Sequence, residues 1–410
     1  MVKNKSKEIF SKKHLEKYAD VLIWGLETAR DSVGGKYKKG DIVRLSYEWE
    51  GVKLAECLYR KLLKRGLHVV VMARPTPEME RAFFQVASDD QLKFLPPWGK
   101  KLNENINGAI SIIAPSSLTH LSDIDSRKIA LSAISSKPLR EVIDKREQDG
   151  KYGWTLCVMP TEDLAKQAKM SIKEYGKEII RACYLDKDNP VQIWKDLYKK
   201  SQDIKKKLNS LDVDYFHIKS VHTDLKIYLG ENRKWLGVSG HNMPSFEIFT
   251  SPDWRGAEGV YYANMPSLKD GNYTEGIRLE FKNGEVVKVE AKKGTDFVKK
   301  QIKMDKGSKR IGEFSLTDKR FSPISRFMAD TLFDENTGGK YGNCHIALGG
   351  SYADTYSGNI KKLNKKLKEK LGFNDSSLHW DIVNTEDKVV TAHLKNGEKK
   401  VIYDDGMFKV

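Results

Sequence analysis

The sequence has few cysteines and no long apolar segment. Its four cysteines, Cys57, Cys157, Cys183 and Cys344, lie far apart and form no Cys-x-x-Cys pair. That spacing is no framework for a secreted disulfide protein and favours reduced thiols in the cytoplasm. The stretch from Met1 to Lys13 is charged and lacks the apolar core of a secretory signal. No apolar run approaches the roughly 18 residues that span a bilayer. We therefore expect a cytoplasmic protein with no membrane partner.

Nucleotide-binding and serine-hydrolase motifs are also missing. The chain has no Gly-x-Gly-x-x-Gly after its first strands, no Gly-x-x-x-x-Gly-Lys-Ser/Thr and no Gly-x-Ser-x-Gly. Gly34-Gly35 precedes an expected strand, so it does not present backbone amides at a strand–helix turn. We therefore expect the first half to be scaffold or part of the substrate cleft.

The chain is basic, with 72 Lys and Arg against 56 Asp and Glu and a net charge of +16. A positive field attracts anions, including nucleic acid. Most of the excess is lysine interleaved with acidic residues, which is typical of solvated helix faces. No RNP, zinc-finger or basic-zipper pattern occurs. We therefore expect no nucleic-acid partner.

The two halves of the 410 residues differ in pattern. The first alternates helical and short apolar segments, which predicts a three-layer α/β domain with a largely parallel sheet, over residues 1–211. Residues 212–410 are rich in alternating strands, and we expect them to form a second, α+β domain. The expected helices of the first half include Lys7–Ala29, Val52–Lys64, Glu78–Val86 and Asp123–Ser135. The expected strands are Asp41–Tyr47, His68–Met72 (buried), Ala109–Ala114 and Trp154–Met159. Thr161 is the expected N-cap of a later helix.

Hairpins mark the second half. Asn-Gly between alternating runs is the strongest short-range hairpin signal. It occurs at Asn283-Gly284 within Gly276–Ala291 and at Asn396-Gly397 within Lys388–Tyr403. A further alternating run covers Tyr215 to Leu229.

Acidic side chains stand among apolar neighbours in two segments. Glu247 lies in H-N-M-P-S-F-E-I-F-T-S-P, and Glu313 lies in K-R-I-G-E-F-S-L. A carboxylate among apolar neighbours costs free energy unless it is paired or binds a metal. An edge strand with the acid in water is the plainer alternative for either segment alone.

Two further segments add histidine. In D-E-N-T-G-G-K-Y-G-N-C-H-I-A-L-G-G-S-Y, Glu335 lies in a polar turn, His345 opens a short apolar run, and Tyr352 follows two glycines. In L-H-W-D-I-V, His379 and Asp381 are two residues apart, so a strand would project both from one face. Cys344 faces away from His345 by the same alternation and is not expected to be a ligand.

The six candidates together indicate metal binding. Imidazole and carboxylate ligands without thiolate suit Zn²⁺, Co²⁺ or Mn²⁺. Six ligands exceed one tetrahedral zinc and suit two divalent ions with a bridging carboxylate, as in many hydrolases. The candidate metal ligands are Glu247, Glu313, Glu335, His345, His379 and Asp381.

The chain resembles the thermophilic-type metallo-aminopeptidases, the group of aminopeptidase T, aminopeptidase S and PepS. The resemblance covers nearly the whole chain and includes W-T-L-C-V-M-P-T-E-D-L-A in the first half. Its specific part is the ordered set N-M-P-S-F-E-I-F-T, R-I-G-E, L-F-D-E-N, C-H-I-A-L-G-G-S-Y and H-W-D.

The resemblance implies a homodimer that hydrolyses peptides with a free N-terminus, with a C-terminal domain that encloses the metal site. It implies that the six candidates are the ligands, that Glu313 lies between the two ions and that Tyr352 is the active-site tyrosine. Two departures stand out: Phe246 replaces a frequent glycine, which would narrow the cavity, and Thr337–Asn343 lengthen the stretch before His345.

The expected catalytic residues are Glu313 and Tyr352. Glu313 or a neighbouring carboxylate would take a proton from water and pass it to the leaving amine, and Tyr352 would donate to the oxyanion. Two alternatives remain at this point. One is a dinuclear hydrolase of another amide, such as a dipeptidase or amidase. The other is a non-catalytic basic scaffold or nucleic-acid-binding protein, whose binding would weaken steeply with salt.

Overall fold

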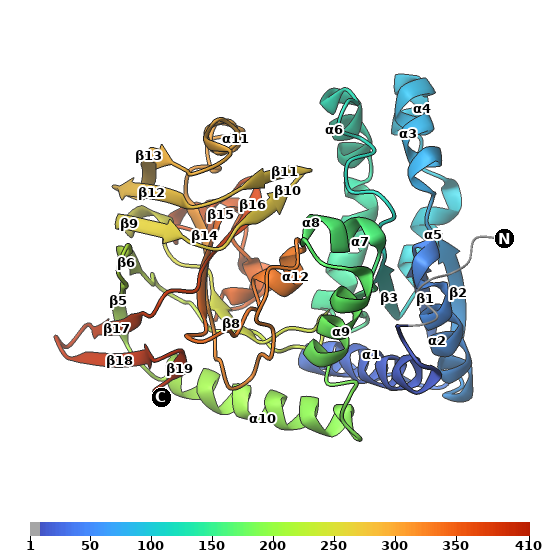
Figure 1. Ribbon diagram of the computed structural model, residues 1–410, viewed down its shortest axis with the longest axis horizontal. Coiled ribbons are helices and arrows are strands. Elements are labelled where there is room, and N and C mark those ends of the chain that lie inside the picture. Colours follow the sequence, from blue (N-terminus) through green and yellow to red (C-terminus); the bar gives the residue numbers. More distant parts are fainter. Residues whose placement is uncertain (1–8) are drawn as a thin grey trace. The chain divides into compact units, whose positions relative to one another are not determined.

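The computed structural model describes residues 9–410, which divide into two compact units (Figure 1). Unit 1 contains the described residues up to Trp194 together with Ser239–Pro244. Unit 2 contains Lys195–Val238 and Ser245–Val410. The division falls within helix α10 (Pro190–Asn209), whereas the boundary placed from sequence lies just beyond that helix. Within residues 9–410, no helix combines the length and apolarity needed to cross a bilayer.

Unit 1 is built on a five-stranded sheet in the order β2-β1-β3-β4-β7, and every pairing in it is parallel. This confirms the predicted α/β architecture. The strands are β1 (Ile42–Tyr47), β2 (His68–Ala73), β3 (Gly108–Ile113), β4 (Gly153–Val158) and β7 (Asn242–Met243). The helices that accompany them are α1 (Lys12–Ser32), α2 (Val52–Lys64), α3 (Pro77–Val86), α4 (Asp89–Lys93), α5 (Pro97–Asn105), α6 (Ser126–Ser135), α7 (Lys137–Gln148), α8 (Glu162–Gln167) and α9 (Ile172–Ala182).

Local capping sets where the helices of unit 1 begin. The Ser11 side chain accepts from the N–H of His14 and caps α1, so the described helix starts at Lys12. The earlier start expected at Lys7 lies outside the described residues. Thr161 caps α8 by accepting from the N–H of Leu164, as predicted.

Strand β2 differs from the expectation of a buried strand. It lies at the edge of the sheet, and Val71 and Met72 are 48% and 44% exposed. A near-continuous apolar run predicts a strand whose two faces are both covered by helices. A strand at the edge of a sheet has only one neighbouring strand, so its side chains can be less completely covered than those of a central strand. The prediction of burial was therefore wrong, although the strand itself is present.

Unit 2 contains two antiparallel sheets of eight and four strands, and a separate pair. The eight-stranded sheet has the order β13-β12-β9-β6-β5-β17-β18-β19, the four-stranded sheet has the order β16-β15-β14-β8, and β10 pairs with β11. The first sheet comprises β5 (Val213–Lys219), β6 (Asp224–Tyr228), β9 (Glu258–Ala263), β12 (Ile277–Lys282), β13 (Glu285–Glu290), β17 (Val389–Leu394), β18 (Lys399–Asp404) and β19 (Met407–Phe408). The other strands are β8 (Glu247–Thr250), β14 (Ile311–Thr317), β15 (Asn343–Gly349), β16 (His379–Asn384), β10 (Ser267–Lys269) and β11 (Asn272–Thr274). The short helices are α11 (Thr295–Gln301), α12 (Thr331–Asp334) and α13 (Lys365–Lys370).

The Asn-Gly turns close the hairpins that they predict. Asn283 and Gly284, at φ 50° and 80°, join β12 to β13. The second turn, at Gly397, joins β17 to β18. The run expected over Tyr215–Leu229 is instead two strands, β5 and β6. The turn between them lacks Gly and Asn, and the Ser220 hydroxyl stabilises it by accepting from the N–H of Thr223.

The core of unit 2 lies between its two large sheets. Phe216 of β5 packs against Phe314 of β14, with ring centroids 5.5 Å apart. The Tyr261 hydroxyl of β9 lies 2.9 Å from the Cys344 carbonyl of β15 and 2.8 Å from the Ile382 carbonyl of β16. Because side chains alternate along a strand, residues adjacent to Phe314 face away from this core. The four-stranded sheet therefore has one apolar face and one face available for chemistry.

Candidate metal centre

The second face of the four-stranded sheet carries five of the six predicted ligands. Glu247 begins β8, Glu313 is in β14, and His345 is in β15. His379 and Asp381 are in β16, two residues apart. Each strand places its candidate ligands on the face opposite the core because the pleat has a period of two.

The register brings these side chains to one point. Ala347 of β15 pairs with Glu313 on one side and with Asp381 on the other. In the next row of the sheet, Ser315 pairs with His345. Directly opposite residues have Cβ atoms about 5 Å apart. The small side chains of Ala347 and Ser315 leave space into which the longer carboxylates and imidazole extend.

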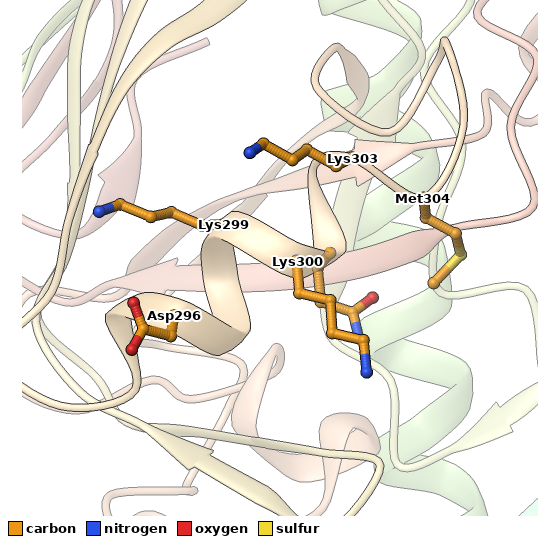
Figure 2. Close-up of a pocket in the computed structure, with 6 residues that line it drawn as sticks. Asp296, Lys299, Lys300, Lys303 and Met304 are labelled. Atoms are coloured by element: carbon orange, nitrogen blue, oxygen red, sulfur yellow. The ribbon is translucent and has the colours of Figure 1, made fainter.

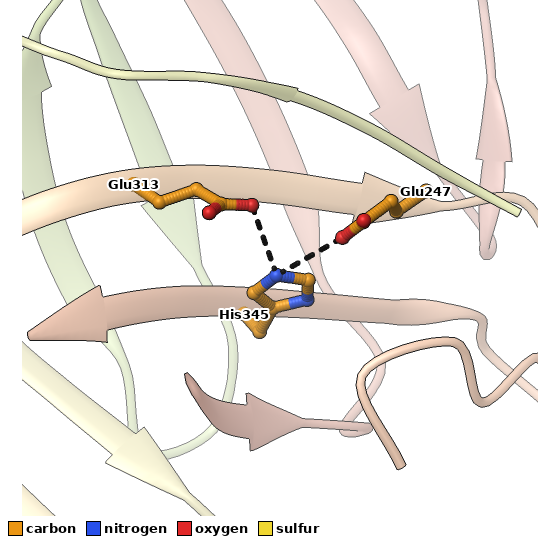
Figure 3. Close-up of side chains that lie close together, drawn as sticks. All are labelled: Glu247, Glu313 and His345. Carbon is orange, nitrogen blue, oxygen red and sulfur yellow. Dashed lines mark hydrogen bonds and ion pairs between the residues drawn. The ribbon is translucent and has the colours of Figure 1, made fainter. Parts of the chain in front are cut away.

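Two groups of ligand atoms result. Glu247, Glu313 and His345 form the first, and Glu313, His379 and Asp381 form the second, with the ligand atoms of each group within 4.8 Å of one another. In the first group, Nε2 of His345 lies 3.4 Å from a carboxylate oxygen of Glu247 and 3.4 Å from one of Glu313 (Figure 3). In the second, Nε2 of His379 lies 3.4 Å from Glu313 and 3.4 Å from Asp381. Glu313 belongs to both groups.

These separations fit ligands arranged around an ion. Direct hydrogen bonds to nitrogen usually span about 2.7–3.2 Å. Two donor atoms that each lie about 2.0–2.2 Å from one tetrahedral ion are about 3.3–3.6 Å apart. The spacing of 3.4 Å for both histidines therefore matches the edge of a coordination polyhedron. The donor set of carboxylates and imidazoles fits the borderline divalent metals.

The backbone orients one histidine for this role. Nδ1 of His379 lies 3.1 Å from the Gly350 carbonyl, so this nitrogen donates to the main chain and Nε2 is left to bind a metal. Such contacts fix the tautomer and the ring orientation. Among the described residues, Nδ1 of His345 is buried without a hydrogen-bond partner.

Glu335 lies beside the two groups but belongs to neither. It follows α12, and its carboxylate accepts a hydrogen bond from the side-chain amide Nδ2 of Asn336 at 3.3 Å. Glu335 and Asp381 both line a small cavity. Asn343, at the end of the longer segment before His345, donates to the Glu335 carbonyl at 2.9 Å.

The gathered acids repel one another electrostatically. Burial and the negative charge of Glu313 raise the pKa of Glu247 to about 8. Burial, together with the charge of Glu247, raises the pKa of Glu335 well above its ordinary range. Burial opposes a charged Asp381, but the adjacent His379 more than offsets this effect and lowers the Asp381 pKa to about 2.

The histidines respond in the opposite direction. Although burial disfavours their charged forms, the carboxylates raise the pKa of His345 to about 9 and of His379 to about 11. Glu313 contributes most to the rise at His345, and Asp381 to the rise at His379. The site therefore holds protons that bound cations would replace.

Tyr352 lies beside the second group. Its ring centroid is 4.8 Å from that of His379 and 5.6 Å from that of Phe249. Its side chain is 43% exposed, so one side of the ring remains open. Partial burial and the nearby carboxylates, Glu313 first among them, raise the pKa of Tyr352, which keeps the phenol protonated.

Several supporting residues escaped the sequence analysis. The Ser315 hydroxyl lies 3.4 Å from Glu247, and the Asn336 side chain accepts from the N–H of Glu247 at 3.1 Å. Nζ of Lys269 lies 3.2 Å from the His379 carbonyl. Ser315 follows Glu313 by two residues, so a strand places both on one face, and this spacing could have identified Ser315 from the sequence. Asn336 and Lys269 come from other segments, and no spacing connects them to the site.

Other sequence features lie elsewhere. Phe246 is fully buried, and its effect on the cavity stays a prediction. His120, His217 and His222 each contact one carboxylate, Glu80, Asp224 and Glu386 respectively. A surface hollow on α11 is lined by Asp296, Lys299, Lys300, Gln301, Lys303 and Met304 and contains none of the candidate ligands (Figure 2).

Fold and site together define the class of this protein as one with a candidate carboxylate–imidazole metal centre on an antiparallel sheet. Comparisons with known proteins specify it further. Residues 11–408 match the thermophilic metalloprotease (M29) family, and the chain belongs to that family.

Full-length relatives agree with the family match. The chain is 27% identical to aminopeptidase AmpS of Bacillus subtilis, over 97% of this chain and 98% of AmpS. It is 25% identical to aminopeptidase T of Thermus thermophilus, over 97% and 99%. The solved structure of wild-type AmpT from Thermus thermophilus superposes with a TM-score of 0.77 at 22% identity, covering 97% of this chain and all of that one, and shows the same fold. The chain is a metallo-aminopeptidase, and the predicted family and enzyme class are confirmed.

Proposed function

We propose that the enzyme uses two divalent ions to remove the first residue from peptides with a free N-terminus. Glu247, Glu313 and His345 would hold one ion, and Glu313, His379 and Asp381 the other, with Glu335 as an additional ligand. The observation that carries this proposal is that the two groups share Glu313. Zn²⁺, Co²⁺ and Mn²⁺ all suit this donor set.

Bound ions would supply Lewis acidity, which lowers the pKa of water toward neutrality. Glu313 or a neighbouring carboxylate would accept a proton from that water and return it to the leaving amine, acting as general base and then general acid. The Tyr352 hydroxyl donates a hydrogen bond to the oxyanion as it develops. Its raised pKa supports this role because only the protonated phenol donates.

The acidic surroundings also favour an amino terminus. Four of the candidate ligands, Glu247, Glu313, Glu335 and Asp381, are carboxylates, and all four are buried or half-buried. The free α-amino group of the peptide would lie against one of them or an ion. An acyl cap would remove that interaction, so blocked peptides should be poor substrates.

The enzyme would act as a cytoplasmic homodimer. The four cysteines are free and buried, which suits a reducing compartment.

In unit 1, strand β2 exposes Val71 and Met72, and α3 exposes Met79 and Val86 at 63% and 82%. Exposed apolar side chains on an edge strand and a helix are typical of an interface. Light scattering should give twice the 46.8 kDa chain mass for the wild type, and Val71→Lys with Val86→Lys should give the monomer mass.

The test is amino-acid release from an unblocked tetrapeptide by chelator-stripped protein, with and without added Co²⁺, Zn²⁺ or Mn²⁺. We expect release of the first residue, then the second, only with an ion and only from the unblocked peptide. Glu313→Gln should remain folded and lose activity by about 100-fold or more, whereas Glu280→Gln, at an exposed position of β12, should retain activity. Equal cleavage of blocked peptides would instead indicate an amidase, and near wild-type activity of Glu313→Gln would refute the role of Glu313.

A further inference from the structure

The β10–β11 pair places one lysine next to the metal centre. Strand β10 runs along β16, the edge strand that carries His379 and Asp381. The N–H of Met265, just before β10, donates to the Val383 carbonyl at 3.3 Å. Further along, the Trp380 indole donates to the Ser267 hydroxyl at 2.9 Å. These contacts hold β10 at a fixed register on the outer edge of the site.

Lys269 ends β10 at the level of His379. Its Nζ lies 3.2 Å from the His379 carbonyl, and its side chain is half-buried. Its positive charge also acts on the Asp381 carboxylate: burial raises the pKa of that group, and Lys269 adds to the larger lowering effects of His379 and His345. An ammonium group has three donors, and one contact to a carbonyl leaves two for another acceptor.

The charges of the candidate ligands and of the two proposed ions indicate which kind of acceptor Lys269 would bind. Four carboxylates, Glu247, Glu313, Glu335 and Asp381, balance two divalent ions when the histidines are neutral. The charge of Lys269 is then not needed for the ligands and remains to attract an anion. In a peptide bound by its N-terminus, the next carboxylate beyond the scissile bond is about one residue, or roughly 3.5 Å, further along the chain.

We propose that Lys269 determines specificity by binding a carboxylate of the substrate immediately beyond the scissile bond. In a dipeptide this group is the α-carboxylate, and in a longer peptide it is an acidic side chain at the second position. The enzyme would thus favour dipeptides and peptides with Asp or Glu in second place. This inference rests on the proposed aminopeptidase activity.

The experiment compares Lys269→Met and Lys269→Arg with the wild type on three substrates, all with added ions. The substrates are Leu-Gly, its C-terminal amide, and Leu-Asp amide. We expect Lys269→Met to lower kcat/KM about tenfold or more on Leu-Gly and Leu-Asp amide, mainly through KM, and to leave Leu-Gly amide nearly unchanged. Lys269→Arg should recover most of the loss because it keeps the charge.

Controls separate this role from a structural one. Lys300→Met removes the same charge from α11, where Lys300 is exposed (Figure 2), and should change none of the three rates. Bound-ion content should be equal in all variants. Calorimetry with D-Leu-Gly and its amide gives a readout without turnover, and Lys269→Met should weaken binding of the free acid alone.

Other outcomes are decisive. An equal loss on all three substrates, or loss of ions, would mean that Lys269 only supports His379, and unchanged rates would also overturn the proposal. A loss on Leu-Gly alone would mean that the lysine binds the α-carboxylate, and a loss on Leu-Asp amide alone would mean that it binds the acidic side chain. If the wild type cleaves none of the three, the proposed function fails instead.

Discussion

At the residue scale, the position of Tyr352 connects packing with catalysis. Its ring contacts those of Phe249 and His379, while part of the side chain remains exposed. Ring packing fixes the direction of the hydroxyl, and the hydroxyl alone would act on substrate. The two contributions can therefore be separated by removing one oxygen atom.

We expect Tyr352→Phe to keep the fold and the bound ions and to lose turnover by about 100- to 1000-fold, the usual loss for one oxyanion donor. The measurement is kcat on an unblocked peptide alongside metal content. Tyr356→Phe, a few residues away against Phe373, is the matched control and should retain activity. Loss of ions from Tyr352→Phe would show a structural role instead.

At the scale of elements, the segment before β16 determines where its two candidate ligands lie. The Asp305 carboxylate accepts from the Ser376 hydroxyl at 2.8 Å and from the N–H and hydroxyl of Ser377, both at 2.8 Å. Leu378 and His379 follow directly. Desolvation opposes the charge, but the Ser377 and Ser376 contacts outweigh it and hold the pKa of Asp305 well below its ordinary range.

Asp305→Asn should therefore destabilise unit 2 by about 1–3 kcal/mol at pH 7. A carboxyl group with a lowered folded-state pKa stabilises the protein above its ordinary pKa of about 3.9, and this contribution is lost as the pH falls below it. The difference from wild type in urea denaturation should thus shrink below about pH 4. Asp387→Asn, at an exposed position, should show no such difference. An equal difference at every pH would contradict the electrostatic explanation.

At the scale of the whole molecule, the carboxylate centre should make the stability of the fold depend on both bound ions and pH. Glu247 has its pKa raised from 4.5 to about 8, and His345 from 6.5 to about 9. Between the unfolded and folded pKa values of each group, the folded state binds more protons than the unfolded state. Stability is therefore lost as the pH rises, between 4.5 and 8 for Glu247 and between 6.5 and 9 for His345.

Chelator-stripped protein should consequently be less stable at pH 9 than at pH 5, and added divalent ions should remove most of this dependence. Urea denaturation across that range, followed by hydrogen exchange of β14 and β15, measures it. Glu247→Gln should flatten the metal-free profile. A profile that is unchanged by ions, or equal changes in β1 to β4 of unit 1, would contradict the prediction.

Much of this was accessible from sequence because it depends on local pattern. Alternating helices and strands predicted the parallel sheet of unit 1, and Asn-Gly turns predicted two hairpins of unit 2. The spacing of His379 and Asp381 placed both on one face of a strand, and the structure has them there. The exposure of β2 was missed because an apolar run does not reveal whether a strand lies at the edge of its sheet.

The sequence by itself determines the residue types at the centre, the family and the local elements, since capping, turns and alternation act between near neighbours. Only the tertiary structure decides that β14 pairs with β8 and β15 and that β15 pairs with β16, so that Glu313 belongs to both ligand groups. It also decides that Lys269 reaches the His379 carbonyl and that β7 joins the sheet of unit 1. Strand order and register join segments far apart in the chain, and no local spacing encodes those pairings.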